Sequence, residues 1–282
     1  MANILQAISR IVSNPIIEVR AFYNERRTPN SVGEAFEKYV KDVFADTFNV
    51  TNETERIRIY SEVFSYLGNQ NNPPDIMLRG GDAVETKKIE SPNSPLALNS
   101  SYPKSKLYAD SPMIIDSCRR CEEWTIKDIV YAVGHTLNGN LRYLWLVYGD
   151  CFAASRERYE RVWNAVSGGI NNIPDIGFSE TNELARINRV DPLGITYLRV
   201  RGMWGIENPK VVFAPIIETD RNARFHLNVL MRTEKFNSFP EVDRNRTTQL
   251  VRENYQVRDI RFRNPDNPAV LLDGKLITFK VV

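Results

Sequence analysis

The amino-acid sequence predicts a mixed α/β fold with the order helix, three strands, helix, strand (αβββαβ), followed by a mostly β extension. Three observations predict it. Apolar residues recur at helical spacing within residues 31–48. Two short β-like segments, 75–78 and 83–89, are separated by a connection that contains Gly-Gly, which is a hairpin signal. Residues 143–148 are nearly all apolar, as expected for a strand buried on both faces.

The first elements lie ahead of this hairpin. Residues 2–13 predict a short helix that ends before a proline. The helix at 31–48 starts with a capping box, in which Ser31 is the N-cap and Glu34 reaches back to its amide. A strand is expected at 62–67.

The elements after the hairpin are a polar loop, two helices and the buried strand. The loop at 91–112 is too polar to belong to the core. We expect a helix at 125–137, because one stripe of helical spacing holds apolar side chains. These are Ile126, Ile129, Val130, Val133 and Leu137. A charged helix is expected at 155–166, after the strand.

The rest of the chain is expected to be mostly β. We predict strands at 195–201, 211–217 and 225–231 and a polar helix at 247–254. The chain then divides into residues 1–168 and residues 169–282, with one continuous domain as the alternative.

Composition limits the class of protein. A chain of 282 residues with 42% hydrophobic residues can bury a sizeable core. No window approaches the roughly 18 uninterrupted apolar residues that a membrane helix needs, so no membrane association is expected. The N-terminus has no basic leader ahead of an apolar run. Three cysteines are too few for a disulfide framework and fit a reducing cytoplasm.

Charge is distributed unevenly along the chain, although the net charge is only +2. Residues 186–263 hold 13 arginines and 2 lysines against 9 acidic residues, an excess of 6 positive charges. Arginine suits bidentate recognition of phosphates and bases. An acidic first part joined to this basic part fits a metal site beside a phosphate-binding surface. The alternative is a solvated surface with ion pairs.

The chemistry of the chain is concentrated in Pro74-Asp75 and Glu85-X-Lys87. Glu85 and Lys87 are two positions apart on a strand and point to the same face. A hairpin brings Asp75 beside Glu85, and two carboxylates suit Mg²⁺. The ammonium of Lys87 can hold an attacking water, which together with a metal ion suffices for phosphodiester hydrolysis. The alternative is a surface strand with an ordinary Glu/Lys pair.

Glu37 is a candidate third carboxylate, because it lies at the edge of the apolar stripe of the 31–48 helix. The alternative for Glu37 is a solvated helix edge. No phosphate-binding G-x-x-x-x-G-K-[ST] motif is present, so ATP has no expected role.

Two regions are candidates for DNA contact. Arginine reads guanine best in the major groove, and Arg199 and Arg201 share one strand face. The loop after the catalytic strand is rich in small donors for phosphates. The candidates are Asn99, Ser100, Ser101, Tyr102, Lys104, Lys106, Arg199, Arg201, Arg221 and Arg224. The alternative for each arginine is a phosphate contact or an ion pair.

These residues resemble a known family. Pro74-Asp75 with Glu85-X-Lys87 resembles the PD-(D/E)XK signature of type II restriction endonucleases. The surrounding sequence is similar to the NgoPII-type restriction enzymes over residues 31–150, in the stretches SVGEAFEKYVKDVFADTF, FSYLGNQNNPPDIMLRGGDAVETKKIES, ALNSSYPKSKLYADSPMI and CRRCEEW.

The resemblance implies a restriction-endonuclease-like core and Mg²⁺-dependent cleavage of both strands of double-stranded DNA. The target would be a short palindrome, GGCC, cut by a homodimer in the cytoplasm of a prokaryotic cell. Asp75 and Glu85 would bind the metal, Lys87 would assist the water, and Glu37 would complete the acidic set. Residues 1–168 would then form the catalytic core and 169–282 the DNA-recognition and dimerisation extension. Two alternatives are a PD-(D/E)XK nuclease of repair or mobile elements and a DNA-binding protein without catalysis.

Overall fold

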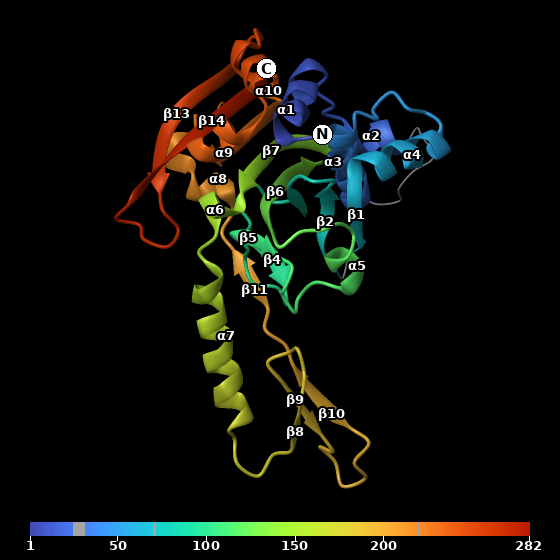
Figure 1. The fold of residues 1–282 in the computed structure, drawn as a ribbon, viewed down its shortest axis with the longest axis vertical. Helices are drawn as coiled ribbons and strands as arrows, with labels where there is room; N and C mark the ends of the chain where they lie inside the picture. Colours follow the sequence, from blue (N-terminus) through green and yellow to red (C-terminus); the bar gives the residue numbers. More distant parts are fainter. Residues whose placement is uncertain (25–31, 70–71, 219, 221) are drawn as a thin grey trace.

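A mixed β-sheet forms the centre of the protein (Figure 1). The computed structural model describes residues 1–24, 32–69, 72–218, 220 and 222–282. The sheet has the order β1-β2-β3-β6-β7-β12-β14-β13, with β5 beside β6. These strands are β1 (Phe64–Asn69), β2 (Asn72–Leu78), β3 (Ala83–Ile89), β5 (Lys106–Tyr108), β6 (Ile126–Leu137), β7 (Asn140–Tyr148), β12 (Phe225–Arg232), β13 (Tyr255–Arg263) and β14 (Leu271–Val281). The pairs β3/β6 and β7/β12 are parallel, and the other neighbours are antiparallel. The sheet therefore takes strands from both halves of the chain, and the expected mixed α/β class is confirmed.

The hairpin of β6 and β7 forms the middle of the sheet. Its turn residues Asn138 and Gly139 have φ values of 54° and 82°. Two successive left-handed residues of type Asn-Gly are the preferred two-residue connection between twisted antiparallel strands. Most side chains of both strands are buried.

The helix expected at 125–137 is wrong, because this segment is strand β6. Its apolar side chains recur at helical spacing, but both faces of the strand are covered, so apolar residues at nearly every position also suit a central strand. The Asn-Gly turn that follows and the β-branched residues in the segment favour the strand. The αβββαβ order therefore lacks its second helix at this place.

Helices near the N-terminus pack beside the sheet (Figure 1). They are α1 (Ile4–Ser13), α2 (Val19–Asn24), α3 (Val32–Ala45) and α4 (Glu53–Val63). The Phe36 ring of α3 lies directly on the β6 backbone at Gly134, where any Cβ would overlap it. The two helices expected at 2–13 and 31–48 are confirmed as α1 and α3, whereas the proposed N-cap Ser31 lies outside the described residues. Helix α4 was not expected.

The remaining short elements are α5 (Asp116–Arg119), α6 (Gly149–Phe152), α8 (Pro209–Val212), the 3-10 helix η1 (Ala214–Ile216), α9 (Thr233–Ser238) and α10 (Glu241–Gln249). The strand expected at 211–217 is wrong: the Asn208 side chain caps Lys210 N at 2.9 Å, and the chain turns into α8 and η1. The helix expected at 247–254 is displaced, because α10 ends at Gln249.

The loop expected at 91–112 contains strands β4 (Leu96–Asn99) and β5. Leu96, Leu98 and Leu107 in it are buried, so its exclusion from the core is wrong at these three positions. The strands expected at 75–78, 83–89, 143–148 and 225–231 are confirmed. The strand expected at 62–67 begins at Phe64, after the end of α4.

A long segment projects away from the central sheet (Figure 1). It consists of α7 (Arg156–Asn171), β8 (Phe178–Ser179), β9 (Ala185–Asn188) and β10 (Tyr197–Val200), and we call residues 156–200 the arm. Its strands form a small sheet of order β10-β9-β8, and no residue of α7 is buried. At the base of the arm, β11 (Trp204–Ile206) pairs with β4. Within the described ranges, no helix has the length and apolar character needed to cross a membrane.

Candidate active site

The hairpin of β2 and β3 brings Asp75 and Glu85 to the same place on the sheet. Its register pairs Ile76 with Val84 and Met77 with Ala83, and Asp75 and Glu85 are the next residues on the two strands. Thr86 fixes the Asp75 carboxylate, because its backbone N and its Oγ1 both donate to Asp75 Oδ2 at 2.6 Å.

Lys87 lies on the same strand face as Glu85. Lys87 Nζ is 2.7 Å from Glu85 Oε1, which is the i, i+2 relation expected for an extended strand. The other carboxylate oxygen, Glu85 Oε2, is buried and has no hydrogen-bond partner among the described residues. A buried carboxylate oxygen without a donor is costly unless another ligand meets it.

Electrostatics couple the three groups. Burial raises the pKa of Asp75 to about 6 and the charge of Glu85 adds to this, although the hydrogen bonds from Thr86 and the charge of Lys87 lower it. Burial on its own would lower the pKa of Lys87, but the adjacent Glu85 carboxylate raises it above its ordinary value. A buried carboxylate whose ionisation is disfavoured by burial and by a second carboxylate forms a place where a cation is stabilised.

The residues present fit a divalent ion with oxygen ligands. Mg²⁺ takes one or two carboxylates and keeps several waters, so Asp75 and the free oxygen of Glu85 supply a sufficient protein contribution. Across the ranges that the structure describes, no group of three or more His, Cys, Asp or Glu residues is arranged to hold a metal ion.

Glu37 is therefore not brought together with the two carboxylates. It lies on α3, where Lys41 Nζ contacts its Oε1 at 2.6 Å. This i, i+4 pair occupies a half-buried helix edge.

The predicted DNA-contact loop lies close to the hairpin but is largely engaged within the protein. Tyr102 donates to Glu160 at 3.2 Å and stacks on Tyr159 at a centroid distance of 5.6 Å. Lys104 is buried and donates to Ser101 Oγ. Asn99 ends β4 opposite Trp204, and Ser100 follows it in the turn.

The predicted arginine pair meets a protein carboxylate. Arg199 and Arg201 contact the same oxygen, Glu183 Oε1, at 2.6 Å and 2.9 Å. The structure thus confirms that Arg199 and Arg201 share a face, and both form ion pairs with the Glu183 carboxylate. Arg224 is exposed, and Arg221 lies outside the described residues.

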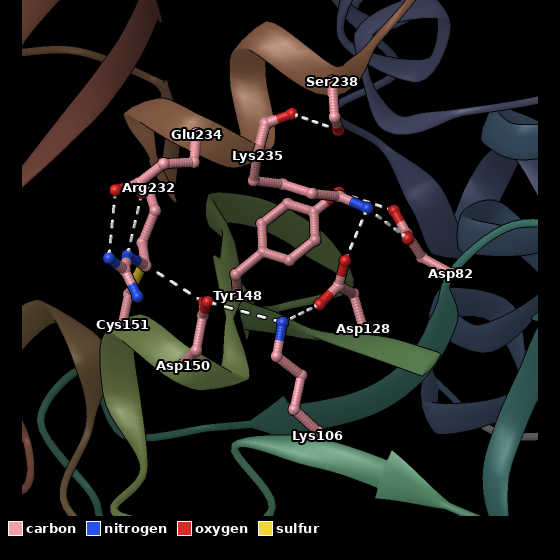
Figure 2. A network of polar contacts seen from close by, with 10 residues as sticks. All are labelled: Asp82, Lys106, Asp128, Tyr148, Asp150, Cys151, Arg232, Glu234, Lys235 and Ser238. Atoms are coloured by element: carbon pink, nitrogen blue, oxygen red, sulfur yellow. Dashed lines mark hydrogen bonds and ion pairs between the residues drawn. The ribbon is translucent and has the colours of Figure 1, made fainter. Parts of the chain in front are cut away.

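A polar network near the start of β3 was missed by the sequence reasoning (Figure 2). Lys235 Nζ joins Asp82 Oδ1 at 2.6 Å and Asp128 Oδ2 at 2.7 Å, and Tyr148 donates to Asp82 Oδ2 at 2.6 Å. Lys106 pairs with Asp128 and lies 3.6 Å from Asp150. These residues are far apart in the sequence and form no motif, so only the strand order brings them together.

Comparison with known proteins defines the class of this chain. The sequence model of the NgoPII restriction endonucleases matches residues 2–263, nearly the whole chain, and the chain belongs to this restriction endonuclease family. It is 48% identical over 278 residues to the type II restriction enzyme NgoPII of Neisseria gonorrhoeae, and the match covers 98% of this chain and 99% of that enzyme. No solved structure matches the chain.

Proposed function

We propose that this chain is a Mg²⁺-dependent type II restriction endonuclease that hydrolyses phosphodiester bonds in both strands of double-stranded DNA. The observation that carries the proposal is the convergence of Asp75, Glu85 and Lys87 on one hairpin, with one buried Glu85 oxygen left without a donor. Membership of the restriction endonuclease family supports the same reaction class.

The roles of the residues follow from their chemistry. Asp75 and Glu85 would hold the ion, which when bound supplies charge to the phosphate and lowers the pKa of a water molecule. Thr86 holds the Asp75 carboxylate through two donors, so the ligand is oriented before the ion arrives. Lys87 would hold the attacking water beside Glu85 and stabilise negative charge on the phosphate. Glu37 would act on this site only after leaving Lys41.

The proposed fold class is a restriction-endonuclease-like core, supported by the β2–β3 hairpin within a mixed sheet. We further propose that residues 1–168 carry catalysis and that residues 169–282 carry DNA recognition and dimerisation. Strands β12, β13 and β14 continue the sheet of the first part, so we propose two functional parts of one continuous domain. Arg199, Arg201, Arg221 and Arg224 remain proposed DNA contacts.

We propose a homodimer, because cutting both strands of a palindrome requires one site for each strand. The arm is the proposed contact with the second copy. Its Leu193 and Ile195 are 81% and 75% exposed, and Tyr197 and Leu198 beside them are also exposed. Several exposed apolar side chains within one short projecting segment support an interface there. The three cysteines are free thiols, which supports a reducing cytoplasm as the location.

Digestion of a plasmid of known sequence tests the function. With Mg²⁺ we expect discrete fragments whose ends all map to GGCC, and no cutting in excess chelator. Discrete fragments whose ends map to another palindrome would overturn only the proposed GGCC target, and restriction would stand as the function. A smear, or cutting confined to branched DNA, would contradict restriction and support a repair nuclease instead.

A further inference from the structure

The chain segment 101–106, which we call the crossing segment, is fixed against the strand next to the catalytic one. Lys104 N donates to Tyr131 OH at 2.7 Å. Tyr131 lies on β6, where it is the register partner of Glu85. The end of the segment pairs with β6 through Lys106 and Asp128. The backbone of Lys104 is therefore held one strand away from the Glu85 carboxylate.

Gly149 makes this close approach possible. A Cβ at Gly149 would overlap the carbonyl oxygen of Lys104 and would lie 2.7 Å from that of Ser105. Backbone atoms cannot move aside as a flexible side chain can, so the path of the crossing segment depends on this glycine.

Lys104 differs from the other buried lysines. It is 9% exposed, its Nζ donates to Ser101 Oγ, and among the described residues it has no carboxylate within ion-pair distance. In contrast, the buried Lys127 pairs with Glu122, and the half-buried Lys235 pairs with Asp82 and Asp128. A buried ammonium without an anion is unfavourable, and such groups are concentrated at functional sites.

Charge links Lys104 to the catalytic hairpin. Burial lowers the pKa of Lys104, whereas the negative charge of Glu85 raises it and the positive charge of Lys87 lowers it. Lys104 is thus within electrostatic reach of both residues. Lys87 is engaged with Glu85 Oε1, which leaves Lys104 as the nearby cation without an anionic partner in the part of the chain described.

We propose that Lys104 is a second active-site lysine, whose ammonium binds a non-bridging oxygen of the phosphodiester that is cut. The inference rests on the proposed function and adds the group that meets the phosphate. Lysine binds phosphate as a point charge. In the hydrolysis, the bond from the water oxygen to phosphorus forms and the bond to the leaving oxygen breaks. The attacking water gives up one proton to solvent, and the leaving oxygen takes one from solvent. Lys104 transfers no proton, and it stabilises the additional negative charge that develops on the non-bridging oxygens.

The first test is the rate of a single turnover with Lys104→Met, a neutral side chain of similar length. We expect the cleavage rate to fall about 100-fold or more, as for removal of one transition-state donor. We expect the melting temperature to stay the same or rise, because an unpaired buried charge is removed.

Lys127→Met is the matched control, since it removes a buried lysine that has a carboxylate partner. It should lower the melting temperature while the folded fraction cleaves at nearly the wild-type rate. Cleavage by Lys104→Met within about threefold of wild type overturns the inference. So does a loss of activity that is explained entirely by unfolding.

The second test separates direct contact from a structural role. The substrate carries a phosphorothioate at the cut position, as each of its two diastereomers. We expect sulfur at one of the two oxygens to slow the wild-type enzyme and to add little further slowing to Lys104→Met. If sulfur slows wild type and Lys104→Met by the same factor in both diastereomers, the proposed contact between Lys104 and a non-bridging oxygen is overturned. A wild-type protein that does not cut with Mg²⁺ overturns the proposed function, whereas an active Lys104→Met overturns this inference alone.

Discussion

Replacing Asp75 with asparagine distinguishes the proposed metal-binding role of this carboxylate from its role in the local structure. Thr86 N and Thr86 Oγ1 both donate to Asp75 Oδ2. The carbonyl oxygen of an asparagine accepts the same two hydrogen bonds, so Asp75→Asn should keep the local structure. It removes the negative charge that burial and Glu85 disfavour. We expect cleavage to be abolished while the metal-free protein becomes more stable.

The magnitude follows from the pKa of Asp75, which the fold raises to about 6 from an ordinary 3.8. The difference corresponds to at most about 3 kcal/mol. The folded state binds this proton more tightly than the unfolded state, so stability falls as the pH rises from below 3.8 through about 6. At about pH 8 the ionised Asp75 lowers the free energy of unfolding of the wild type by the full amount of at most about 3 kcal/mol. At about pH 5 it lowers it by roughly half of that amount.

Urea unfolding in excess chelator measures this difference. We expect Asp75→Asn to raise the free energy of unfolding at the higher pH and to raise it less at the lower one. Glu90→Gln is the control, because Glu90 is an exposed carboxylate directly after the neighbouring strand β3 and its ion pair with Lys88 is at the surface. A destabilised Asp75→Asn, or a gain that is the same at both pH values, would refute the reasoning.

Three further predictions concern pH, the crossing segment and the arm. Because protons compete with the cation for Asp75, the Mg²⁺ concentration needed for half-maximal single-turnover cleavage should rise as the pH falls through about 6, and a requirement that does not change with pH would contradict this. Gly149→Ala should lower the free energy of unfolding by about 1–3 kcal/mol, since its Cβ meets backbone. Gly168→Ala, where the Cβ meets nothing within 4 Å, should be stabilising in the same urea assay. If the chain forms the proposed homodimer through the arm, Leu193→Ser together with Ile195→Ser should reduce its mass in sedimentation to that of a monomer, and a mass equal to that of the wild-type dimer would exclude this part of the arm as the interface.

The β2–β3 hairpin could be predicted from the sequence, because residues close together in the sequence determine it. Asp75 and Glu85 are ten positions apart, the connection contains Gly-Gly, and strand alternation sets Lys87 on the face of Glu85. A short antiparallel pair leaves few other arrangements for these three residues.

Strand β6 could not be predicted in the same way, because the strands that pair with it and cover it include segments far away in the sequence. Ile126, Ile129, Val130 and Val133 fit helical spacing, and the parallel pairing of their strand with β3 joins residues that are 46 positions apart. The Asn-Gly turn after it was the available signal. The position of Lys104 depends likewise on Tyr131 and Gly149, which no spacing in the crossing segment indicates.

The most direct test of the active-site assignment is a single turnover on a duplex with one GGCC site in Mg²⁺, comparing wild type with Glu85→Gln. The substitution keeps the size of the side chain and removes the charge of the buried oxygen that lacks a donor. We predict that wild type cuts both strands at one position and that Glu85→Gln is slower by about 1000-fold or more with its fold intact. Cleavage by Glu85→Gln at the wild-type rate would contradict the assignment of this hairpin as the metal-binding catalytic centre.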